Sequence, residues 1–564
     1  MQAPLFSLNR VLTVALLWAA LVVAGVVALM GAASPNLAMA FPPFSNAAAN
    51  GSLWTVARGE STAWKILPDR LECTVSQSGP HWIISKSPIE GDFVLEASVG
   101  PKLGKGEGVV FSANADLSYG YLLVIDATTS LYRFSGADQK LVTSWPLGDR
   151  ASGTNTVRIL KKGTTYRIEV GGRVLNTITN PGGERTAKPQ PPEPDGGHWG
   201  FAFSTEGSHT VSGMRGVAIP RAKFLSTNPV VEVGPQGSWD QSAEAFASAV
   251  FEYKNNFYLY YSADYDHPPN GIKEEPLHRI GIATSSDLQT WKKYEKNPVL
   301  GAPLTGDIMK FFDLPASYVF ATMQGGGGVV RLPGGQIGLT FNVLGWNGKG
   351  QWLGVWLAEG SSPLGPFHKV QPGPILSPGG SVDFDGTTMH LHGAQQLADG
   401  TYAILYTGYN KNIAKGKPGD RGGLATSKDM IHWTKYAGNP IFVPGEPGSW
   451  DDEHVRPKTF VKLKDWYYMF YEGAHFSQGG WPEWPDQVGL ARSRDLINWE
   501  RYPYNPLIST TTVGHSGDVA QIQPAAMVAN GTLYVFYGCL NAGKPFAVCG
   551  AEIPSQLLQE WGKP

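Results

Sequence analysis

Three segments in the second half of the chain are nearly interchangeable. They read RIGIATSSDLQTWKKYEKNPVL (279–300), RGGLATSKDMIHWTKYAGNPIF (421–442) and VGLARSRDLINWERYPYNPLI (488–508). Degenerate copies at 353–376 and 546–554 bring the number to five, and an aromatic strand such as DWYYMFYEG recurs with each copy. Five copies, about 66 to 76 residues apart and each long enough for about four strands, predict a five-bladed β-propeller over residues 226–556.

The first half of the chain shows a period of two instead of this long repeat. Apolar and polar residues alternate in FVLEASV (93–99), NTVRILKKG (155–163) and TYRIEVGGRVL (165–175), and Gly and Asn bound these runs. Such alternation predicts half-buried antiparallel strands, here a β-sandwich over residues 50–222. The stretch KPQPPEPDGG (188–197) is predicted to be a loop, because each Pro removes a hydrogen-bond donor from a sheet.

The composition agrees with an all-β chain. The 564 residues include 69 Gly, 42 Pro and 18 Trp, a combination that favours short strands and turns over helices. The net charge is −2 and the chain has no basic run, which argues against a nucleic acid partner.

The N-terminal segment differs from the rest of the chain. Arg10 precedes an apolar run from Val11 to Ala33, and Ala38-Met39-Ala40 supplies a cleavage pattern of small residues. This predicts a signal peptide over residues 1–40 and an exported protein, either secreted, periplasmic or at the cell surface. The run is also long enough to span a bilayer, so retention as an N-terminal membrane anchor stays open.

The chain has three cysteines, too few for a disulfide framework. Cys539 and Cys549 flank a predicted hairpin, which leaves two alternatives. Either they are bonded across adjacent strands, with Cys73 left over, or all three are small buried apolar residues.

The Ser-x-Asp part of the repeat is predicted to be structural. Its Asp caps a tight turn, while the Leu or Met and the Trp that follow pack between blades. Three copies with the same residues are not three active sites. We therefore expect Trp291, Trp433 and Trp499 to be core residues without a role in substrate binding.

The repeat also carries a specific resemblance. The GLATSKD…W…NP motif, which follows a strand such as YYMFYEG, resembles the furanosidase superfamily of five-bladed propellers, including glycoside hydrolase families 43, 32, 68, 117 and 130. The first half resembles the laminin-G and concanavalin-like jelly rolls that accompany sugar-active enzymes. The resemblance implies an all-β chain in which an N-terminal jelly-roll β-sandwich precedes a five-bladed β-propeller with a glycosidase site in its channel.

One Asp recurs in all five copies, directly before the predicted innermost strand. The five residues are Asp240, Asp313, Asp385, Asp451 and Asp518. An Asp common to every blade is expected to have a structural role. A catalytic role for one or two of the five stays open.

The residues that follow these Asp residues differ between copies. Alternate residues of a strand share a face, and the innermost strands of a propeller line its channel. Six polar side chains are therefore expected in one cavity, namely His390, His392, His454, Arg456, Gln521 and Gln523. Polar groups this varied either bind a substrate or form a structural network with ordered water.

The acidic residues depart from the family 43 pattern. The positions that match its catalytic carboxylates hold Ala247, His392, Arg456 and Gln523, none of them acidic. The carboxylates of a hydrolase would then come from neighbouring positions, namely Asp240 and Glu244 in the first copy, Asp385 in the third, and Asp452 and Glu453 in the fourth. Glu472, which closes the YYMFYEG strand, is a further candidate for the substrate site.

These residues predict an exported glycoside hydrolase that cleaves a poly- or oligosaccharide by acid–base catalysis in the channel. Two alternatives stay open. One is a non-catalytic carbohydrate-binding protein on the same scaffold, which the missing acids favour. The other is a phosphorylase, as the resemblance to family 130 implies, in which His454 and Arg456 would hold phosphate.

No cofactor is expected, and no metal ligands are assigned. Three His residues in one channel nevertheless leave a channel metal such as calcium open. A membrane partner is expected only if the N-terminal segment is retained.

Overall fold

The computed structural model describes residues 54–561 except for the intervening segments 68–69, 101–107, 126–127, 136–137, 147–154, 163–164, 180–195, 205, 242–244, 266–276, 302–313, 315–319, 347–349, 411–418, 447–448, 475–485, 510–519 and 541–545. The predicted signal peptide (1–40) and Glu244 lie outside the described residues. The described elements are almost all strands, with a 3₁₀ turn at Ser61–Ala63 and a short helix, α4 (Ser555–Glu560), so the predicted all-β class is confirmed. Neither of these helical elements is long and apolar enough to cross a membrane.

Residues 54–218 form two antiparallel sheets. One has the strand order β1 (Trp54–Arg58), β4 (His81–Ser85), β14 (Gly196–Phe203), β7 (Gly108–Ala113), β8 (Gly120–Val124), β9 (Thr128–Ser135) and β10 (Asp138–Pro146), with β5 (Ile89–Glu90) also paired to β14. The other has the order β13 (Arg173–Thr179), β12 (Thr165–Val170), β11 (Asn155–Lys162), β6 (Phe93–Gly100), β15 (Gly207–Ala218), β3 (Arg70–Val75) and β2 (Trp64–Ile66). The alternating sequence runs correspond to β6, β11, β12 and β13.

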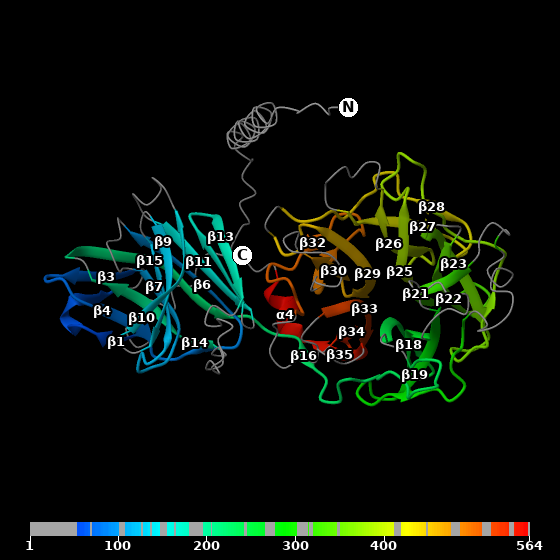
Figure 1. Cartoon of the computed structure of the whole chain (residues 1–564), viewed down its shortest axis with the longest axis horizontal. Coiled ribbons are helices and arrows are strands. Elements are labelled where there is room, and N and C mark those ends of the chain that lie inside the picture. Colours follow the sequence, from blue (N-terminus) through cyan, green and yellow to red (C-terminus); the bar gives the residue numbers. More distant parts are fainter. Residues whose placement is uncertain are drawn as a thin grey trace, which may run out of the picture. The chain divides into compact units, whose positions relative to one another are not determined.

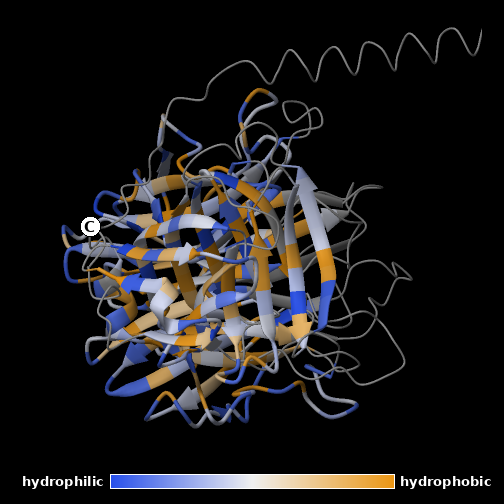
Figure 2. Ribbon diagram, turned by 90° about the vertical axis from the view of Figure 1, so that its left-hand side faces the viewer, coloured by the Kyte–Doolittle hydropathy of each residue, from blue (hydrophilic) through white to orange (hydrophobic). Residues whose placement is uncertain are grey.

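One hydrophobic core is shared by the two sheets. It joins Leu95, Ile159 and Ile168 of one sheet with Phe111 and Phe201 of the other, all of them buried. Successive side chains of a strand point to opposite faces, so a strand with one face in this core alternates in polarity. Figure 2 shows this alternation as orange beside white or blue along the strands.

The remaining strands form five four-stranded blades (Figure 1). Blade 1 contains β17 (Ala245–Tyr253), β18 (Asn256–Tyr265), β19 (Leu277–Ser285) and β20 (Lys292–Lys293), and blade 2 contains β21 (Phe320–Arg331), β22 (Ile337–Trp346), β23 (Gly350–Gly360) and β24 (His368–Lys369). Blade 3 contains β25 (Thr388–Gln396), β26 (Tyr402–Tyr409), β27 (Arg421–Ser427) and β28 (Trp433–Lys435), and blade 4 contains β29 (His454–Leu463), β30 (Trp466–Ala474), β31 (Gln487–Ser493) and β32 (Glu500–Arg501). Blade 5 contains β33 (Ala520–Ala529), β34 (Thr532–Leu540), β35 (Ala547–Ile553) and β16 (Lys223–Phe224). The five-bladed propeller is therefore confirmed.

The ring closes with a strand that precedes the repeat in the chain. β16 pairs with β35 as the outermost strand of blade 5, with Lys223 opposite Glu552 and Phe224 opposite Ala551. The innermost strands contact one another in the circular order β17, β21, β25, β29, β33 and back to β17. Their N-terminal ends meet at one end of the ring, which we call the mouth.

The hydrophobic cores of the propeller lie between neighbouring blades. Trp291 packs edge-to-face on Phe536 of blade 5, with ring centroids 5.2 Å apart. Trp433 packs against the cluster of blades 2 and 3, and Trp499 against that of blades 3 and 4. The expected packing between blades is confirmed, but all three rings are half-buried, because they lie at the start of the outermost strands.

The Ser-x-Asp turns have the predicted structure. Asp429 Oδ1 accepts hydrogen bonds from the backbone amides of Ile431 and His432, at 2.9 and 2.8 Å. Asp287 and Asp495 accept equivalent bonds in blades 1 and 4. The capped turn is therefore a structural feature of these three blades.

The Asn of each Asn-Pro pair hydrogen-bonds both backbone groups of one residue in the third strand of its blade. Asn439 Oδ1 accepts from the Leu424 amide and Nδ2 donates to the Leu424 carbonyl, both at 2.9 Å. Asn297, Asn505 and Asn228 make the same pair of bonds in blades 1, 4 and 5. This fixes the chain against the third strand of the blade.

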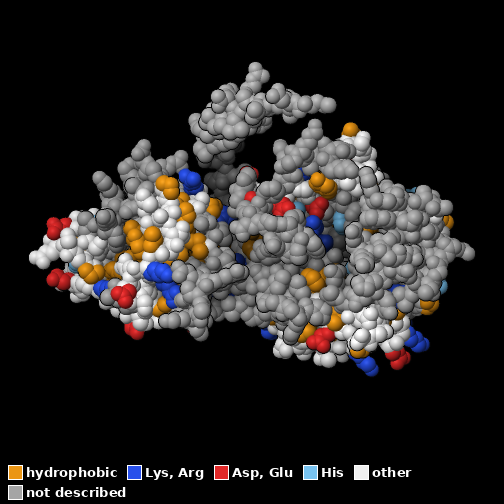
Figure 3. Space-filling model, in the orientation of Figure 1, with side chains coloured by type: hydrophobic (Ala, Val, Ile, Leu, Met, Phe, Trp, Pro, Cys, Tyr) orange, Lys and Arg blue, Asp and Glu red, His pale blue; other side chains and the backbone are white. Residues whose placement is uncertain are grey.

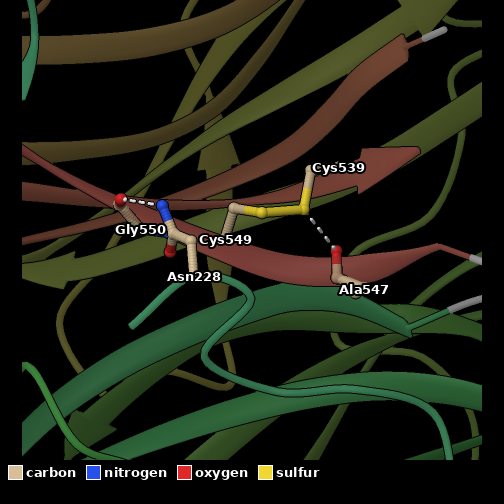
Figure 4. The surroundings of a disulfide bond; sticks show 5 residues. All are labelled: Asn228, Cys539, Ala547, Cys549 and Gly550. Atoms are coloured by element: carbon tan, nitrogen blue, oxygen red, sulfur yellow. Dashed lines mark hydrogen bonds between the residues drawn. A yellow bond between two sulfur atoms is a disulfide. The ribbon is translucent and has the colours of Figure 1, made fainter. Parts of the chain in front are cut away.

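The cysteine pair is bonded. Cys539 in β34 and Cys549 in β35 form a disulfide next to the contact between Asn228 and Gly550 (Figure 4). Cys73 is free and buried. The bridge joins two neighbouring strands of the blade in which the ring closes.

We expect Asn439→Ala to destabilise the propeller by about 1–3 kcal/mol, because the buried Leu424 amide would lose its side-chain acceptor, while the Leu424 carbonyl would keep the Tyr436 amide. Denaturant unfolding measures the change. Lys428→Ala, at an exposed position in the same blade, is the control and should change stability by less than about 0.5 kcal/mol. Equal effects of the two substitutions would contradict the structural role of Asn439.

Candidate active site

The recurring Asp residues lie in equivalent ion pairs. Asp240 pairs with Lys293 at 2.7 Å and Asp385 pairs with Lys435 at 2.6 Å. In each case the lysine lies on the outermost strand of the blade. Asp451 pairs in the same way with Arg501 at 2.8 Å. These contacts fit a structural role. The candidates Asp240 and Asp385 therefore each join two strands of their own blade and, among the residues that the structure describes, neither contacts the charged groups at the mouth. Asp313 and Asp518 lie outside the described residues.

A second set of charged groups gathers at the mouth between blades 3 and 4, around Arg456 near the start of β29. Its guanidinium contacts Asp420 through Nε at 2.5 Å and Asp486 through Nη1 at 3.3 Å. His454 Nε2 lies 3.0 Å from the other oxygen of Asp486. Figure 3 shows acidic, basic and histidine side chains together beside a hollow in the propeller.

Local strand geometry explains why these groups meet. In blade 4, β30 ends opposite the start of β29, with Ala474 paired to His454, and β31 begins opposite the same end of β30. Asp486 directly precedes β31, and Asp420 directly precedes β27 of blade 3. The Asp420 carbonyl also accepts from the Val455 amide, so the two blades are joined at this point.

A buried ion pair lies beside Arg456. Lys458 Nζ is 3.1 Å from Glu472 Oε2, and the Arg456 Nη1 is 3.7 Å from the same oxygen. The other oxygen of Glu472 accepts a hydrogen bond from the Gln523 amide of β33 at 2.5 Å. Glu472 therefore connects two cations of blade 4 with the innermost strand of blade 5.

The charges around Arg456 stabilise ionised carboxylates. Burial acts to raise the pKa of Asp420, but the charge and hydrogen bond of Arg456, together with His390 and His454, outweigh it and the pKa lies below its ordinary value. For Asp486, burial is likewise outweighed by the His454 hydrogen bond and by Arg456, and its pKa is also lowered. Burial acts to lower the pKa of Arg456, but the surrounding carboxylates hold it above its ordinary value. These three groups are therefore charged at neutral pH.

Glu453 differs from these carboxylates. It is half-buried directly before β29, and its amide bonds the Ala474 carbonyl. Burial raises the pKa of Glu453, although His454 opposes the shift. The negative charges of Asp486 and Asp452 act in the same direction as burial. A carboxyl with a raised pKa thus lies close to one with a lowered pKa, an arrangement used for acid–base catalysis.

The remaining polar candidates have different surroundings. Burial lowers the pKa of His390 to about 3, so this side chain is neutral at neutral pH, and it lies close enough to Asp420, Lys458 and Arg456 to be affected by their charges. His392 lies in β25 and Gln521 lies in β33, as predicted. The side chains of these two residues are not among those that the structure describes.

The structure thus brings together six of the predicted residues, namely Glu453, His454, Arg456, Glu472, His390 and Gln523. Asp452 is buried next to them. Among the residues that the structure describes, no group of three His, Cys, Asp or Glu is arranged to hold a metal ion.

Sequence reasoning missed Asp420, Asp486 and Lys458. A signal for the two carboxylates was present: the repeats continue one step further back as DRGGLA and DQVGLA, so Asp420 and Asp486 occupy equivalent positions. Lys458 has no Lys at the equivalent positions, Ser248 in β17 and His392 in β25. It is the extra residue of a β-bulge between Pro457 and Thr459, where strand alternation changes.

Comparison with known proteins gives a family match. Residues 367–502 match the model of the glycosyl hydrolases family 32 N-terminal domain. The matched segment contains the mouth residues from His390 to Asp486. The five-bladed fold and this match together confirm the resemblance to the five-bladed glycoside hydrolase superfamily. A comparison with curated proteins finds no match.

Several solved structures are similar to parts of this chain at low identity. A glycosyl hydrolase from Bacteroides ovatus is 18% identical, with 60% of this chain and 94% of that chain covered and a TM-score of 0.43. A thermostable family-43 glycoside hydrolase is 18% identical, with coverages of 57% and 90% and a TM-score of 0.40. The carbohydrate binding module CBM66 from Bacillus subtilis is 15% identical, with coverages of 29% and 95% and a TM-score of 0.24.

We expect Asp451→Asn to destabilise the protein by about 2 kcal/mol or more, because it leaves the partly buried Arg501 without its charged partner. Thermal and denaturant unfolding measure this. Glu252→Gln, at an exposed position of β17, should leave both midpoints unchanged. A stable Asp451→Asn variant would show that the recurring Asp has no structural role in blade 4.

Proposed function

We propose that the protein is a glycoside hydrolase whose catalytic centre is the mouth between blades 3 and 4. The observation that carries this proposal is that Glu453, directly before β29, lies near enough to the ionised Asp486 for the charge of Asp486 to contribute to its raised pKa. Glu453 is assigned as the general acid that protonates the leaving oxygen. Asp486 is assigned as the carboxylate that acts on the opposite side, either on water or on the sugar itself.

The neighbouring residues support these roles through charge and position. His454 and Arg456 both contact Asp486, so they orient the carboxylate and keep it ionised. Asp420 contributes a further negative charge near Arg456. Glycosidic cleavage passes through an oxocarbenium-like state, and fixed negative charges in a site with little water stabilise such a cation.

The same contacts favour hydrolysis over phosphorolysis. Arg456 lies within 4 Å of Asp420, Asp486 and Glu472, so its charge is already balanced by carboxylates. A phosphate ion bound there would meet these negative charges at short range, which is unfavourable. The proposed substrate is a poly- or oligosaccharide, and the sandwich is proposed to hold the polymer. Export rests on the N-terminal sequence.

The direct test measures reducing ends released from a panel of plant, algal and microbial polysaccharides. We expect wild-type protein to release them and Glu453→Gln and Asp486→Asn to lose about 10²–10⁴-fold in rate with little loss of folding. Asp451→Asn is the matched control from the same segment: the folded fraction should keep its activity. Binding without release by the wild type would instead support the non-catalytic carbohydrate-binding alternative.

The pH dependence follows from the two pKa shifts. Asp486 must be ionised, so kcat/KM should fall as the pH drops through its lowered pKa. Glu453 must be protonated, so kcat/KM should fall as the pH rises through its raised pKa. Between these limits we expect a bell-shaped profile with an acidic optimum.

Glu453→Gln should remove the alkaline limb of this profile. It should also retain most activity on aryl glycosides, whose leaving groups need no protonation. An unchanged alkaline limb in this variant would show that another residue is the acid.

A further inference from the structure

Lys458 and Glu472 form a deeply buried ion pair at the mouth. Their side chains are 4% and 3% exposed, and the charged atoms lie 3.1 Å apart. Burying two charges costs free energy that an ion pair only partly returns, so such a pair is weak evidence for a purely stabilising role. A different role is therefore worth testing.

Both residues are placed to act on Arg456. The bulge between Pro457 and Thr459 makes Lys458 an additional residue of β29 just after Arg456. Glu472 lies directly opposite Arg456 in the register of β29 and β30, and its carboxylate is within 4 Å of both cations. The hydrogen bond from the Gln523 amide fixes this carboxylate from blade 5.

A comparison within the protein separates this pair from the structural ones. The pair of Lys435 and Asp385 also has a buried carboxylate, but its lysine is 29% exposed and lies on the outermost strand. Lys458, in contrast, contributes to the electrostatics of both His390 and Asp486 at the mouth. Its charge therefore acts on the site itself.

We propose that Lys458 and Glu472 are positioning residues: their ion pair holds Arg456 between Asp420 and Asp486 and sets the net charge that Asp486 experiences. The influence of this ion pair on catalysis rests on the proposed function, in which Asp486 is the catalytic carboxylate. Removal of Lys458 makes the surroundings of Asp486 more negative, and removal of the Glu472 charge makes them more positive. The two halves of one ion pair thus have opposite effects on Asp486.

The charged and titratable groups that face Asp486 come from several elements. From β29 these are His454, Arg456 and Lys458, and Glu453 directly precedes that strand. Glu472 of β30 and Asp420 before β27 act through the shared Arg456. Because these groups are unchanged in both substitutions, apart from the one replaced, the two variants can be compared directly.

The experiment measures the acid limb of the kcat/KM profile in full-length protein. An opposite charge within about 4–6 Å lowers a carboxyl pKa by roughly 1–3 units, and a like charge raises it. Lys458→Met should move the acid limb to higher pH, and Glu472→Gln should move it to lower pH. The double variant Lys458→Met/Glu472→Gln should return close to wild type. Lys435→Met is the matched control and should lower the melting temperature without moving the limb.

A second readout does not need activity. Nuclear magnetic resonance of isotope-labelled aspartate, with Asp486→Asn to assign the signal, reports the titration of Asp486 directly and should show the same opposite shifts. If the wild type releases no reducing ends but Asp486 shifts as expected, the proposed function fails and the positioning role stands. Shifts in the same direction, no shifts, or failure of all three variants to fold would overturn the positioning role, because the pair would then serve stability alone.

Discussion

Closure of the five-bladed ring is the constraint on which the arrangement of the site depends. β16 pairs with β35, and the innermost strands contact one another in a circle, so strands from distant parts of the sequence present their first residues at one mouth. The framework that fixes these strand ends is repeated in blades 1, 3 and 4. It consists of the Asn-Pro contact, the Ser-x-Asp turn and the ion pair of the recurring Asp.

Repeated residues form this framework, whereas the mouth also contains residues that occur in one blade alone. Asp451 is held by Arg501 and belongs to the framework, whereas Glu453 and Arg456, only a few residues further on, belong to the mouth. Arg456 then organises the charges there, because three carboxylates from two blades lie within 4 Å of it. Charges that are fixed before the substrate binds need no reorganisation during the reaction, which is the main advantage of an active site over water.

Much of the fold could be predicted from the sequence because its signals are local and repeated. The period of the Gly-Leu-Ala segments predicted the five blades, and the Ser-x-Asp turns predicted their own hydrogen bonds. Strand alternation predicted that Arg456 and His454 lie on the same face of their strand, toward the channel. The strand that closes blade 5 was not predicted, because two residues of β16 carry no pattern of their own.

The site was harder to predict because it depends on contacts across blades. Asp240 and Asp385 could not be separated from Asp486 by residue type alone, since only the structure shows which carboxylate meets Lys293 or Lys435 and which meets Arg456. Lys458 could not be placed because the bulge interrupts the alternation on which the argument rested. The shift of Glu453 depends on burial and on the charge of Asp486, which follow from folding.

A crystal structure of the Asp486→Asn variant with a bound oligosaccharide tests the central claim most directly, namely that the mouth between blades 3 and 4 is the functional centre. We predict that the sugar lies at this mouth, with a glycosidic oxygen within hydrogen-bond distance of Glu453 and a ring close to position 486. A sugar bound beside Asp240 in blade 1, or in the sandwich alone, would contradict the account.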